Sequence, residues 1–211
     1  MPEQDTLIDL LRHGEPVGGR AYRGNSIDDP LTGNGWQQMR NAVGQHTQWD
    51  RIITSPLRRC REFAEELGAR ITIPVTIEPG FREVGFGVWE GKSPSEIIEG
   101  DPESYEAFYR DPEHCRPDGA EPLSEFSDRV NGVFDTLVQT CGGENTLVVS
   151  HAGVMRAIVA HVLGAPLSSM YRLRIDNGGM VRIRFNTYGP KLELFNGSLG
   201  RDRPVGQDEC L

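Results

Sequence analysis

The sequence lacks features that mark several whole classes of protein. Its 211 residues include four cysteines, which are widely spaced and form no C-x-x-C pair, so no zinc site or thioredoxin-like redox motif is encoded locally. No apolar run approaches the ~20 residues of a membrane helix. Residues 1–5 also lack the basic and then apolar layout of a signal peptide. We therefore expect reduced thiols, no membrane partner and a cytoplasmic location.

Positive charge is also scarce in this chain. Lys and Arg total 22 against 31 Asp and Glu, which gives a formal net charge of −9. A protein that binds nucleic-acid backbones without specificity needs a basic face, so we expect no nucleic-acid partner, although a local basic pocket stays open. The five histidines show no H-E-x-x-H or comparable spacing, and we therefore predict no metal site.

Length and composition suit one buried core. With 37% hydrophobic and 25% charged residues, we predict a single domain over residues 1–211, although length alone would also permit two small domains. Residues 93–118 contain short polar helical pieces interrupted by prolines, and we expect this helical insertion to cover a site. Residues 197–211 are rich in Gly, Arg, Asp and Pro, which predicts a loosely held tail.

Strand and helix patterns alternate along most of the chain. Strands are predicted at residues 6–11, 51–54 and 146–149, a further strand followed by an ordered loop at 71–89, and a terminal hairpin at 180–186 and 191–195. Helices are predicted at residues 32–43 with Thr32 as the cap, from Ser55–Pro56 to Leu67, at 123–137 and at 154–163. This alternation predicts an α/β fold, a three-layer sandwich with a central, mostly parallel sheet and helices on both faces.

Two histidines follow the ends of predicted strands, where ligands bind in parallel sheets. Arg12, His13 and Gly14 end the first strand, and His151 and Gly153 follow a later one. Either histidine alone would more often be a structural or surface residue. Together they are more informative, because a glycine within two residues of each allows a backbone or a ligand to approach closely.

Six blocks of sequence, in order and covering roughly residues 5–185, resemble the histidine phosphatase superfamily, also called the phosphoglycerate-mutase-like family. The blocks are Leu11–Glu15 (L-R-H-G-E), Asp29–Gly35 (D-P-L-T-G-N-G), Thr54–Arg59 (T-S-P-L-R-R), Phe81–Gly91 (F-R-E-V-G-F-G-V-W-E-G), Pro117–Glu121 (P-D-G-A-E) and Val149–Gly153 (V-S-H-A-G). One R-H-G alone is weak evidence, but six ordered blocks are specific.

The resemblance implies that His13 is the nucleophile that takes the phosphoryl group. It also implies that Arg12, Arg59 and His151 close around the phosphate, and that Glu83 serves the leaving group as an acid. We expect His151 to be cationic in the complex with substrate and to donate to the transferring group. This set is coherent, because phosphoryl transfer depends on positioning and on stabilising charge spread over the equatorial oxygens. Guanidinium forks and a helix start can supply that stabilisation, so no metal and no cofactor are required.

Arg58 and Arg59 are neighbours on a predicted helix and point about 100° apart, so both cannot enter one pocket. The family pattern selects Arg59. We expect Arg58 and Arg61 to lie on a solvated helix face and Cys60 to be a small core residue.

Arg20, Tyr22 and Arg23 follow the first catalytic block. We expect Arg20 and Arg23 to bind the rest of the substrate, with Arg23 preferred because it lies closest to the family's substrate-binding loop pattern. A solvent-facing loop is the alternative for each of these residues. Trp89 is expected to pack in its loop.

The sequence departs from phosphoglycerate mutases at two places. Those enzymes usually carry asparagine six residues after the nucleophile, where this chain has Gly19, and their Glu-Arg-His-Tyr-Gly segment is replaced by Glu83–Gly87 (E-V-G-F-G). The block Phe81–Gly91 is more similar to the α-ribazole phosphatase and broad-specificity phosphatase branches.

We therefore predict a phosphomonoesterase that acts through a phosphohistidine at His13 on a small phosphorylated metabolite, with α-ribazole 5′-phosphate as one candidate. A phosphoglycerate mutase and a non-catalytic phosphate-binding protein remain the alternatives. A metal hydrolase would need convergent ligands that the histidine spacing does not offer. The oligomeric state stays open.

Overall fold

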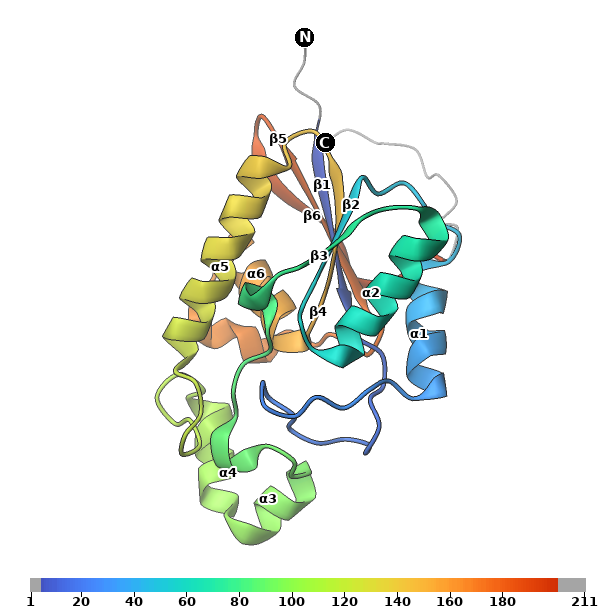
Figure 1. The fold of residues 1–211 in the computed structure, drawn as a ribbon. Helices are drawn as coiled ribbons and strands as arrows, with labels where there is room; N and C mark the ends of the chain where they lie inside the picture. Colours follow the sequence, from blue (N-terminus) through green and yellow to red (C-terminus); the bar gives the residue numbers. More distant parts are fainter. Residues whose placement is uncertain (1–4, 201–211) are drawn as a thin grey trace.

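The computed structural model describes residues 5–200, and its centre is one six-stranded sheet (Figure 1). The strands are β1 (Thr6–Arg12), β2 (Arg51–Thr54), β3 (Val75–Ile77), β4 (Asn145–Ser150), β5 (Met180–Asn186) and β6 (Gly189–Gly197). Their order across the sheet is β3-β2-β4-β1-β5-β6. The pairs β3–β2, β2–β4 and β4–β1 are parallel, whereas β5 and β6 are antiparallel. The predicted mostly parallel sheet and terminal hairpin are confirmed.

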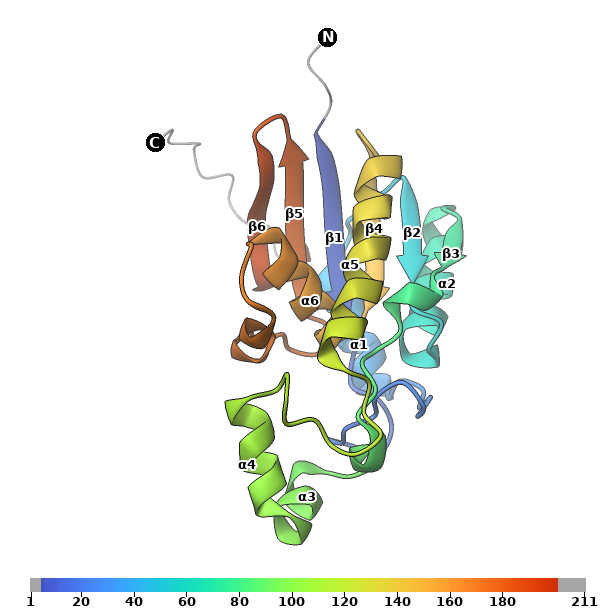
Figure 2. The same cartoon turned by 90° about the vertical axis from the view of Figure 1, so that its left-hand side faces the viewer.

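Helices cover both faces of the sheet, as predicted. They are α1 (Gly33–Val43), α2 (Arg58–Ile71), α3 (Pro94–Gly100), α4 (Pro102–Arg110), α5 (Leu123–Thr140) and α6 (Ala152–Val162), with short 3₁₀ helices at Pro79–Phe81, Gly87–Trp89 and Leu167–Arg172. Figure 2 shows α5 and α6 on one face and α1 and α2 on the other. None of the helices in residues 5–200 is long and apolar enough to cross a membrane.

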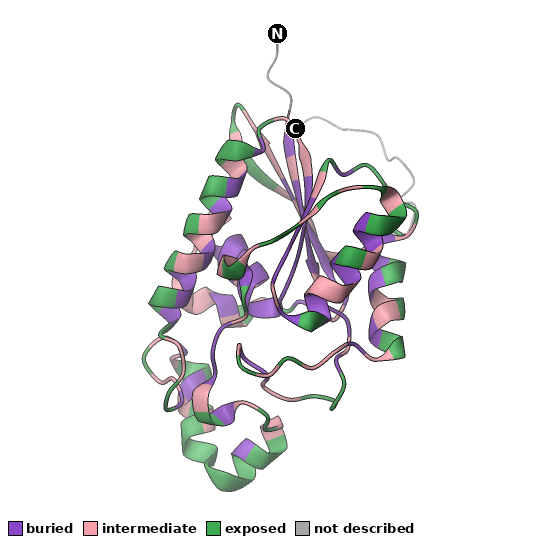
Figure 3. Ribbon diagram, viewed as in Figure 1, coloured by how far each residue is buried: buried purple, intermediate pink, exposed green. Residues whose placement is uncertain are grey.

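The alternation of side chains along the strands supplies two apolar layers. On β1, Ile8 and Leu10 pack with the α5–α6 side, while Leu11 packs with the α1–α2 side. Helices α1, α2, α5 and α6 turn their buried faces to the sheet, and α1, α2 and α5 turn exposed faces to solvent (Figure 3). Complete burial of a side chain such as Phe126 contributes about 1.5–3 kcal/mol, so these layers hold the sheet that positions the loops at its carboxyl edge.

Local signals explain where two helices begin. The hydroxyl of Thr32 accepts a 2.9 Å hydrogen bond from the amide of Gly35, which confirms Thr32 as the cap of α1. The predicted start of α2 at Ser55–Pro56 is wrong by two or three residues, because Ser55 still donates its amide to Val149 at 3.0 Å and so belongs to the sheet. Helix α6 begins at Ala152, two residues before the predicted Val154.

Residues 93–118 contain α3 and α4, which lie below the carboxyl edge of the sheet (Figure 2). A reciprocal cap between Ser93 and Glu96 starts α3. Phe108 of α4 is fully buried, and its ring packs 5.2 Å from that of Trp89. Trp89 is 5% exposed, as expected for a packing residue.

The predicted tail at residues 197–211 is described only in its first part. Gly197 ends β6, and the amides of Leu199 and Gly200 donate to the carbonyl of Ala42 at 2.8 and 3.0 Å. These residues are therefore held against α1. Residues 201–211 lie outside the described residues.

Candidate active site

The parallel pairing of β1 with β4 brings two histidines together. Arg12 lies opposite Ser150 in the register, and the amide of His13 donates to the carbonyl of Ser150 at 3.0 Å. Both strands therefore end at the same edge, and the rings of His13 and His151 meet edge to face with centroids 5.3 Å apart. The structure thus brings together the two histidines that the strand-end argument selected.

One hydrogen bond determines which nitrogen of His13 is available. Its Nδ1 lies 2.7 Å from the carbonyl oxygen of Gly14. Because a carbonyl only accepts, we assign the proton to Nδ1 and the free lone pair to Nε2. Burial lowers the pKa of His13 well below its usual 6.5, and the charges of Arg12 and Arg59 lower it further. His13 is therefore a neutral imidazole whose Nε2 keeps a free lone pair.

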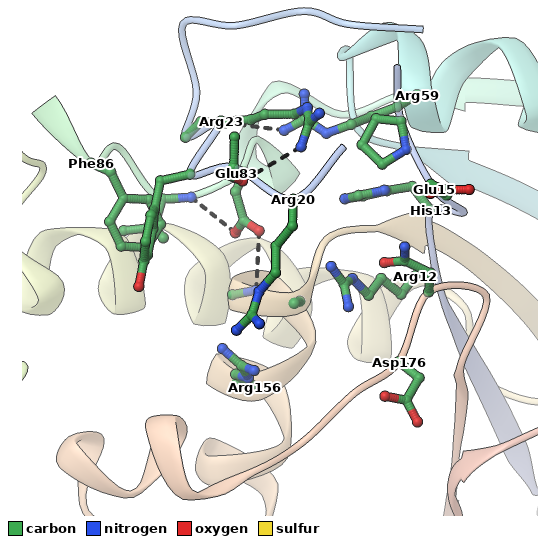
Figure 4. A pocket seen from close by; sticks show the side chains of 18 of the residues that line it. Arg12, His13, Glu15, Arg20, Arg23, Arg59, Glu83, Phe86, Arg156 and Asp176 are labelled. Carbon is green, nitrogen blue, oxygen red and sulfur yellow. Dashed lines mark hydrogen bonds between the residues drawn. The ribbon is translucent and has the colours of Figure 1, made fainter. Parts of the chain in front are cut away.

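Two arginines, half-buried Arg12 and buried Arg59, lie on either side of His13 (Figure 4). Arg12 donates from Nη1 to the carbonyl of Ile175 at 2.7 Å, and Arg59 donates to the carbonyls of Ile27 and Gly24 at 2.8 and 3.0 Å. The Nε of each arginine is buried without a partner among residues 5–200. Such fixed guanidiniums with unused N–H groups suit an anion with several oxygens.

Both arginines stay charged near neutral pH. Burial lowers the pKa of Arg12 to about 10 and also lowers the pKa of Arg59, while the charge of Glu83 opposes the effect in each case. A guanidinium with a pKa of about 10 is almost fully protonated at pH 7. The pair therefore forms a fixed, doubly positive clamp, which we call the phosphate clamp.

His151 is completely buried and held from two sides. Its Nε2 lies 2.7 Å from the hydroxyl of Ser55, and the thiol of Cys60 lies 3.6 Å from Nε2 and 3.7 Å from Nδ1. Burial lowers the pKa of His151 well below 6.5, followed by the charges of Arg59 and His13. His151 is therefore a neutral imidazole in the protein alone, with one N–H to donate, whereas the cationic form is expected for the complex with substrate.

Glu83 reaches the same place from a loop. One carboxylate oxygen accepts from its neighbour's amide at 3.0 Å, and the other accepts from the amide of Gly153 at 3.2 Å in the first turn of α6. The amide of Gly153 thus holds the Glu83 side chain at the first turn of α6. A Cβ on Gly153 would lie 2.2 Å from Oε1 of Glu83, so the glycine makes room for the carboxylate.

Gly14, by contrast, serves backbone packing and not ligand approach. A Cβ on Gly14 would lie 2.0 Å from the carbonyl oxygen of Gly35, and one on Gly35 would lie 2.2 Å from that of Glu15. Only glycine at both positions lets the loop after β1 pass this close to the start of α1.

Arg12, His13, Arg59 and Glu83 line a cavity of about 620 Å³, whereas the fully buried His151 is not among its lining residues. Residues of the 15–24 loop, Tyr109 of α4 and residues of the segment 170–177 also line it. In residues 5–200 no group of three or more His, Cys, Asp or Glu side chains could hold a metal ion.

The predicted substrate-binding residues have different environments. Arg23 is 9% exposed and is occupied by Asp29 at 3.0 Å and by the carbonyls of Val17 and Gly19 at 2.6 and 2.8 Å, so it ties its own loop together. Arg20 is exposed and extends into the cavity (Figure 4).

Tyr22, the third residue of this loop named from the sequence, shares a 2.7 Å hydrogen bond between hydroxyl groups with Tyr109 of α4, and both line the cavity. This bond joins the loop to the 93–118 segment.

The helix-face prediction holds for Arg58 and Cys60. Arg58 is exposed and pairs with Glu62 at 2.7 Å, and Cys60 is fully buried. Arg61 is half-buried, and its Nε has no partner in the described chain.

Sequence reasoning missed two residues of the site, Ser55 and Arg156. Ser55 lies inside the Thr54–Arg59 block, but the sequence analysis assigned it no role in the site. Arg156 lies three and four residues after Gly153 and Ala152, and the helical spacing places it on the same face. That spacing could have revealed it, and Arg156 does line the cavity.

Comparison with known proteins agrees with this geometry. The family model of the histidine phosphatase superfamily (branch 1) matches residues 8–198. An adenosylcobalamin/alpha-ribazole phosphatase of Escherichia coli K12 is 31% identical over 191 residues, which cover 89% of this chain and 94% of that protein. Phosphoserine phosphatase 1 of Hydrogenobacter thermophilus is 29% identical over 174 residues, which cover 80% and 81% of the two chains.

Among solved structures, the alpha-ribazole phosphatase from Shigella flexneri superimposes with a TM-score of 0.80 at 30% identity, covering 93% of this chain and 100% of that one. This chain is therefore a phosphatase and belongs to branch 1 of the histidine phosphatase superfamily.

Proposed function

We propose that this phosphatase hydrolyses a small phosphomonoester in two steps, through a phosphohistidine at Nε2 of His13. The observation that carries the proposal is the 2.7 Å bond from Nδ1 of His13 to the carbonyl of Gly14, set between the two arginines of the phosphate clamp. It leaves Nε2 unprotonated beside the fixed positive charge of the two arginines. The protein thereby supplies what phosphoryl transfer needs, a nucleophile next to groups that stabilise negative charge.

In the first step, Nε2 attacks phosphorus and the P–O bond to the leaving alcohol breaks. The charge of the transition state spreads over the equatorial oxygens, which Arg12, Arg59 and an N–H of His151 stabilise. Glu83 gives its proton to the leaving oxygen, so the alcohol departs neutral. Ser55 acts as a positioning residue, because its hydroxyl holds the His151 ring.

In the second step, water attacks the phosphohistidine. The carboxylate of Glu83 takes a proton from that water, the N–P bond breaks, and Nε2 recovers its lone pair. Glu83 thereby regains the proton that it lost in the first step, and inorganic phosphate leaves. No step uses a metal or a cofactor.

The substrate belongs to the small phosphorylated metabolites. α-Ribazole 5′-phosphate and phosphoserine are the candidates that the names of the relatives suggest. In this proposal Arg20 contacts the non-reacting part of the substrate, whereas Arg23 shapes the loop. Residues 93–118 cover the cavity mouth, supported by Pro94 and Tyr109 in its lining.

We further propose that residues 1–211 form one domain, because strands from both ends of the described chain join one sheet. A cytoplasmic location fits the free thiols of Cys60, Cys115 and Cys141, and the acidic charge of −9 fits a small-molecule partner and no nucleic acid.

The test is chemical trapping of the intermediate. Rapid quenching of the protein with a ³²P-labelled phosphomonoester should give an acid-labile label, and His13→Ala should lose both label and turnover. His114→Ala, an exposed histidine of the 93–118 segment, is the matched control and should keep both. Undiminished labelling of His13→Ala would refute the nucleophile, and loss of activity in chelator that only added metal restores would refute the metal-free mechanism.

A further inference from the structure

Two arginines of the cavity lie outside the phosphate clamp. Arg20, from the loop after β1, and Arg156, from α6, both line the cavity. Neither makes a hydrogen bond or an ion pair with another residue in the described range 5–200, whereas Arg12, Arg23 and Arg59 in the same cavity are each held by loop carbonyls. Figure 4 shows the side chain of Arg20 extending across the cavity toward the side where Arg156 lies.

Arg156 is partly buried, and not all of its hydrogen-bond donors have a partner in the described residues. Its Nε is buried without a partner in residues 5–200, and its guanidinium lies 5.9 Å from the centroid of the Tyr171 ring. Arg156 also lies close enough to Arg12 for its charge to lower the pKa of Arg12. Like charges at this range oppose each other unless an anion lies between them.

The cavity lining holds five arginines but three carboxylates, and none of the three carboxylates forms an ion pair with Arg20 or Arg156 in the described residues. Glu83 is bound to the first turn of α6, and Glu15 accepts from Asn34 at 2.7 Å. Asp176 pairs with Arg174 at 2.9 Å. Arg20 and Arg156 therefore bring two positive charges into one cavity that the described chain does not balance.

An unpaired Nε alone would not identify a site, because Arg61 has one too and does not line the cavity. The difference is that Arg156 faces a cavity that already holds a phosphate clamp and a second free guanidinium. This combination suits a ligand with two separated negative groups.

We infer that Arg20 and Arg156 form a second anion subsite, so that the substrate is a phosphomonoester carrying a second anionic group, a carboxylate or another phosphate. This inference rests on the proposed phosphatase function and specifies its substrate class. The two guanidiniums offer planar forks that match either anion. The phosphoryl group to be removed occupies the clamp at His13, and the second anion binds at the α6 side of the cavity.

An aromatic base is the competing occupant, because Tyr22, Phe86 and Tyr109 also line the cavity and arginine can stack on rings. One face of the Arg156 guanidinium already lies over Tyr171, and a ligand ring stacked on the other face would accept no hydrogen bond from it. It would leave the edge N–H groups of Arg156 without an acceptor, which is the unfavourable arrangement for a buried donor. The geometry therefore favours an anion.

Two pairs of substrates that differ in one anionic group test the subsite. 3-Phosphoglycerate is compared with glycerol 3-phosphate, which has a hydroxymethyl group in place of the carboxylate, and fructose 1,6-bisphosphate is compared with fructose 6-phosphate. We expect kcat/KM to be at least tenfold higher for the member with the second anion in at least one pair. The pair that responds distinguishes a carboxylate from a phosphate.

The arginine variants assign that preference to the subsite. Arg156→Gln and Arg20→Gln should each reduce the ratio of kcat/KM within the responding pair by about fivefold or more. Arg110→Gln removes the same charge from an exposed position of α4 outside the cavity lining and should leave the ratio unchanged. Because Arg20 is exposed, its variant remains informative if Arg156→Gln fails to fold.

Three outcomes would overturn the inference: ratios near one in both pairs, ratios that neither arginine variant changes, or α-ribazole 5′-phosphate exceeding every two-anion substrate tenfold. Turnover of p-nitrophenyl phosphate, which has no second anion, separates these outcomes from failure of the proposed function. If its hydrolysis depends on His13, the phosphatase mechanism stands whether or not the subsite does.

Discussion

At the scale of residues, the neutral state of His13 and His151 links the active site to the stability of the fold. Both pKa values are depressed by burial first and by neighbouring positive charge second. In the unfolded chain each histidine regains a pKa near 6.5. Below that pH the unfolded state therefore binds more protons than the native state, and folding stability is lost as pH falls.

We predict that the free energy of unfolding decreases between pH 6.5 and 5.5 by up to about 1.4 kcal/mol per pH unit for each of the two histidines. Urea denaturation at pH 7.5, 6.5 and 5.5 measures it. His114 should oppose this trend only weakly, because it is exposed although Asp111 raises its pKa. His13→Gln should reduce the slope. A wild-type free energy that is flat from pH 7.5 to 5.5 would contradict the neutral assignment.

Glu83 should matter in proportion to how poorly the alcohol leaves. A phenolate of low pKa departs with little protonation, whereas an alkoxide needs a proton in the transition state. We predict that Glu83→Gln lowers kcat by about 10²–10⁴-fold for an alkyl phosphate and far less for p-nitrophenyl phosphate, as measured by steady-state kinetics on both.

Two comparisons sharpen that measurement. Arg59→Gln should reduce turnover of both substrates by similar factors, because its fork stabilises the transferring group whatever leaves. Glu62→Gln removes a carboxylate that pairs with exposed Arg58 and should change neither. Equal losses on the two substrates for Glu83→Gln would mean that Glu83 only anchors its loop to α6.

At the scale of elements, the first turn of α6 controls where the Glu83 carboxylate lies. A Cβ on Gly153 would lie 2.2 Å from Oε1 of Glu83, the mobile end of a side chain, so the carboxylate would move and the helix would not. Alanine in a helix is more favourable than glycine by about 0.8–1.0 kcal/mol. Gly153→Ala should therefore reproduce the substrate-dependent loss of Glu83→Gln without lowering the melting temperature.

Gly132→Ala in α5 is the matched control for Gly153→Ala, because nothing lies within 4 Å of its added Cβ. It should raise the melting temperature slightly and leave kinetics unchanged. If Gly153→Ala lowers the melting temperature but keeps full activity, then the close approach of Glu83 to α6 is not needed for catalysis.

Some helices and strands could be predicted from sequence patterns alone, and others could not. The apolar runs of β1 and β4 and the spacing along α1 and α5 identified those elements, because burial alone determines such patterns. The start of α2 could not be read from its sequence, because the bond from Ser55 to Val149 depends on β4, which lies far along the chain. The motif block around Thr54–Arg59 nevertheless identified Arg59.

Side-chain partners were the least predictable part of the site. The sequence favoured Arg23 over Arg20 for substrate binding, but Asp29 and two carbonyls occupy the Arg23 guanidinium, while Arg20 is free in the described chain. The hydrogen-bond partners of these two arginines cannot be predicted from the sequence, because they depend on the path of the loop after β1. The contact of Ser55 with His151 likewise joins residues from two strands.

At the scale of the whole molecule, the order β2-β4-β1 gathers the site from distant parts of the chain. β1 supplies Arg12 and His13, the turn after β2 leads to Ser55 and Arg59, and β4 leads to His151. All three strands are parallel, so their carboxyl ends meet at one edge. The antiparallel hairpin β5–β6 extends the sheet beyond β1.

The shape of the cavity predicts which of two related reactions the protein performs. A mutase must retain a doubly phosphorylated intermediate while it reorients and must keep water from the phosphohistidine. Here Gly19 stands where mutases usually carry asparagine, and nothing lies within 4 Å of a Cβ built on it. Val84 and Phe86, in place of mutase polar residues, offer only apolar side chains to the cavity.

Water should therefore reach the phosphohistidine before a second phosphoryl transfer can occur. We predict that 3-phosphoglycerate gives free phosphate, whether or not 2,3-bisphosphoglycerate is present, and no more than traces of 2-phosphoglycerate. Phosphate release and 2-phosphoglycerate formation are measured on the same samples. Efficient isomerisation that depends on 2,3-bisphosphoglycerate, with negligible phosphate release, would show that Arg20 and Arg156 suffice to retain the intermediate and that the open position at Gly19 does not admit water.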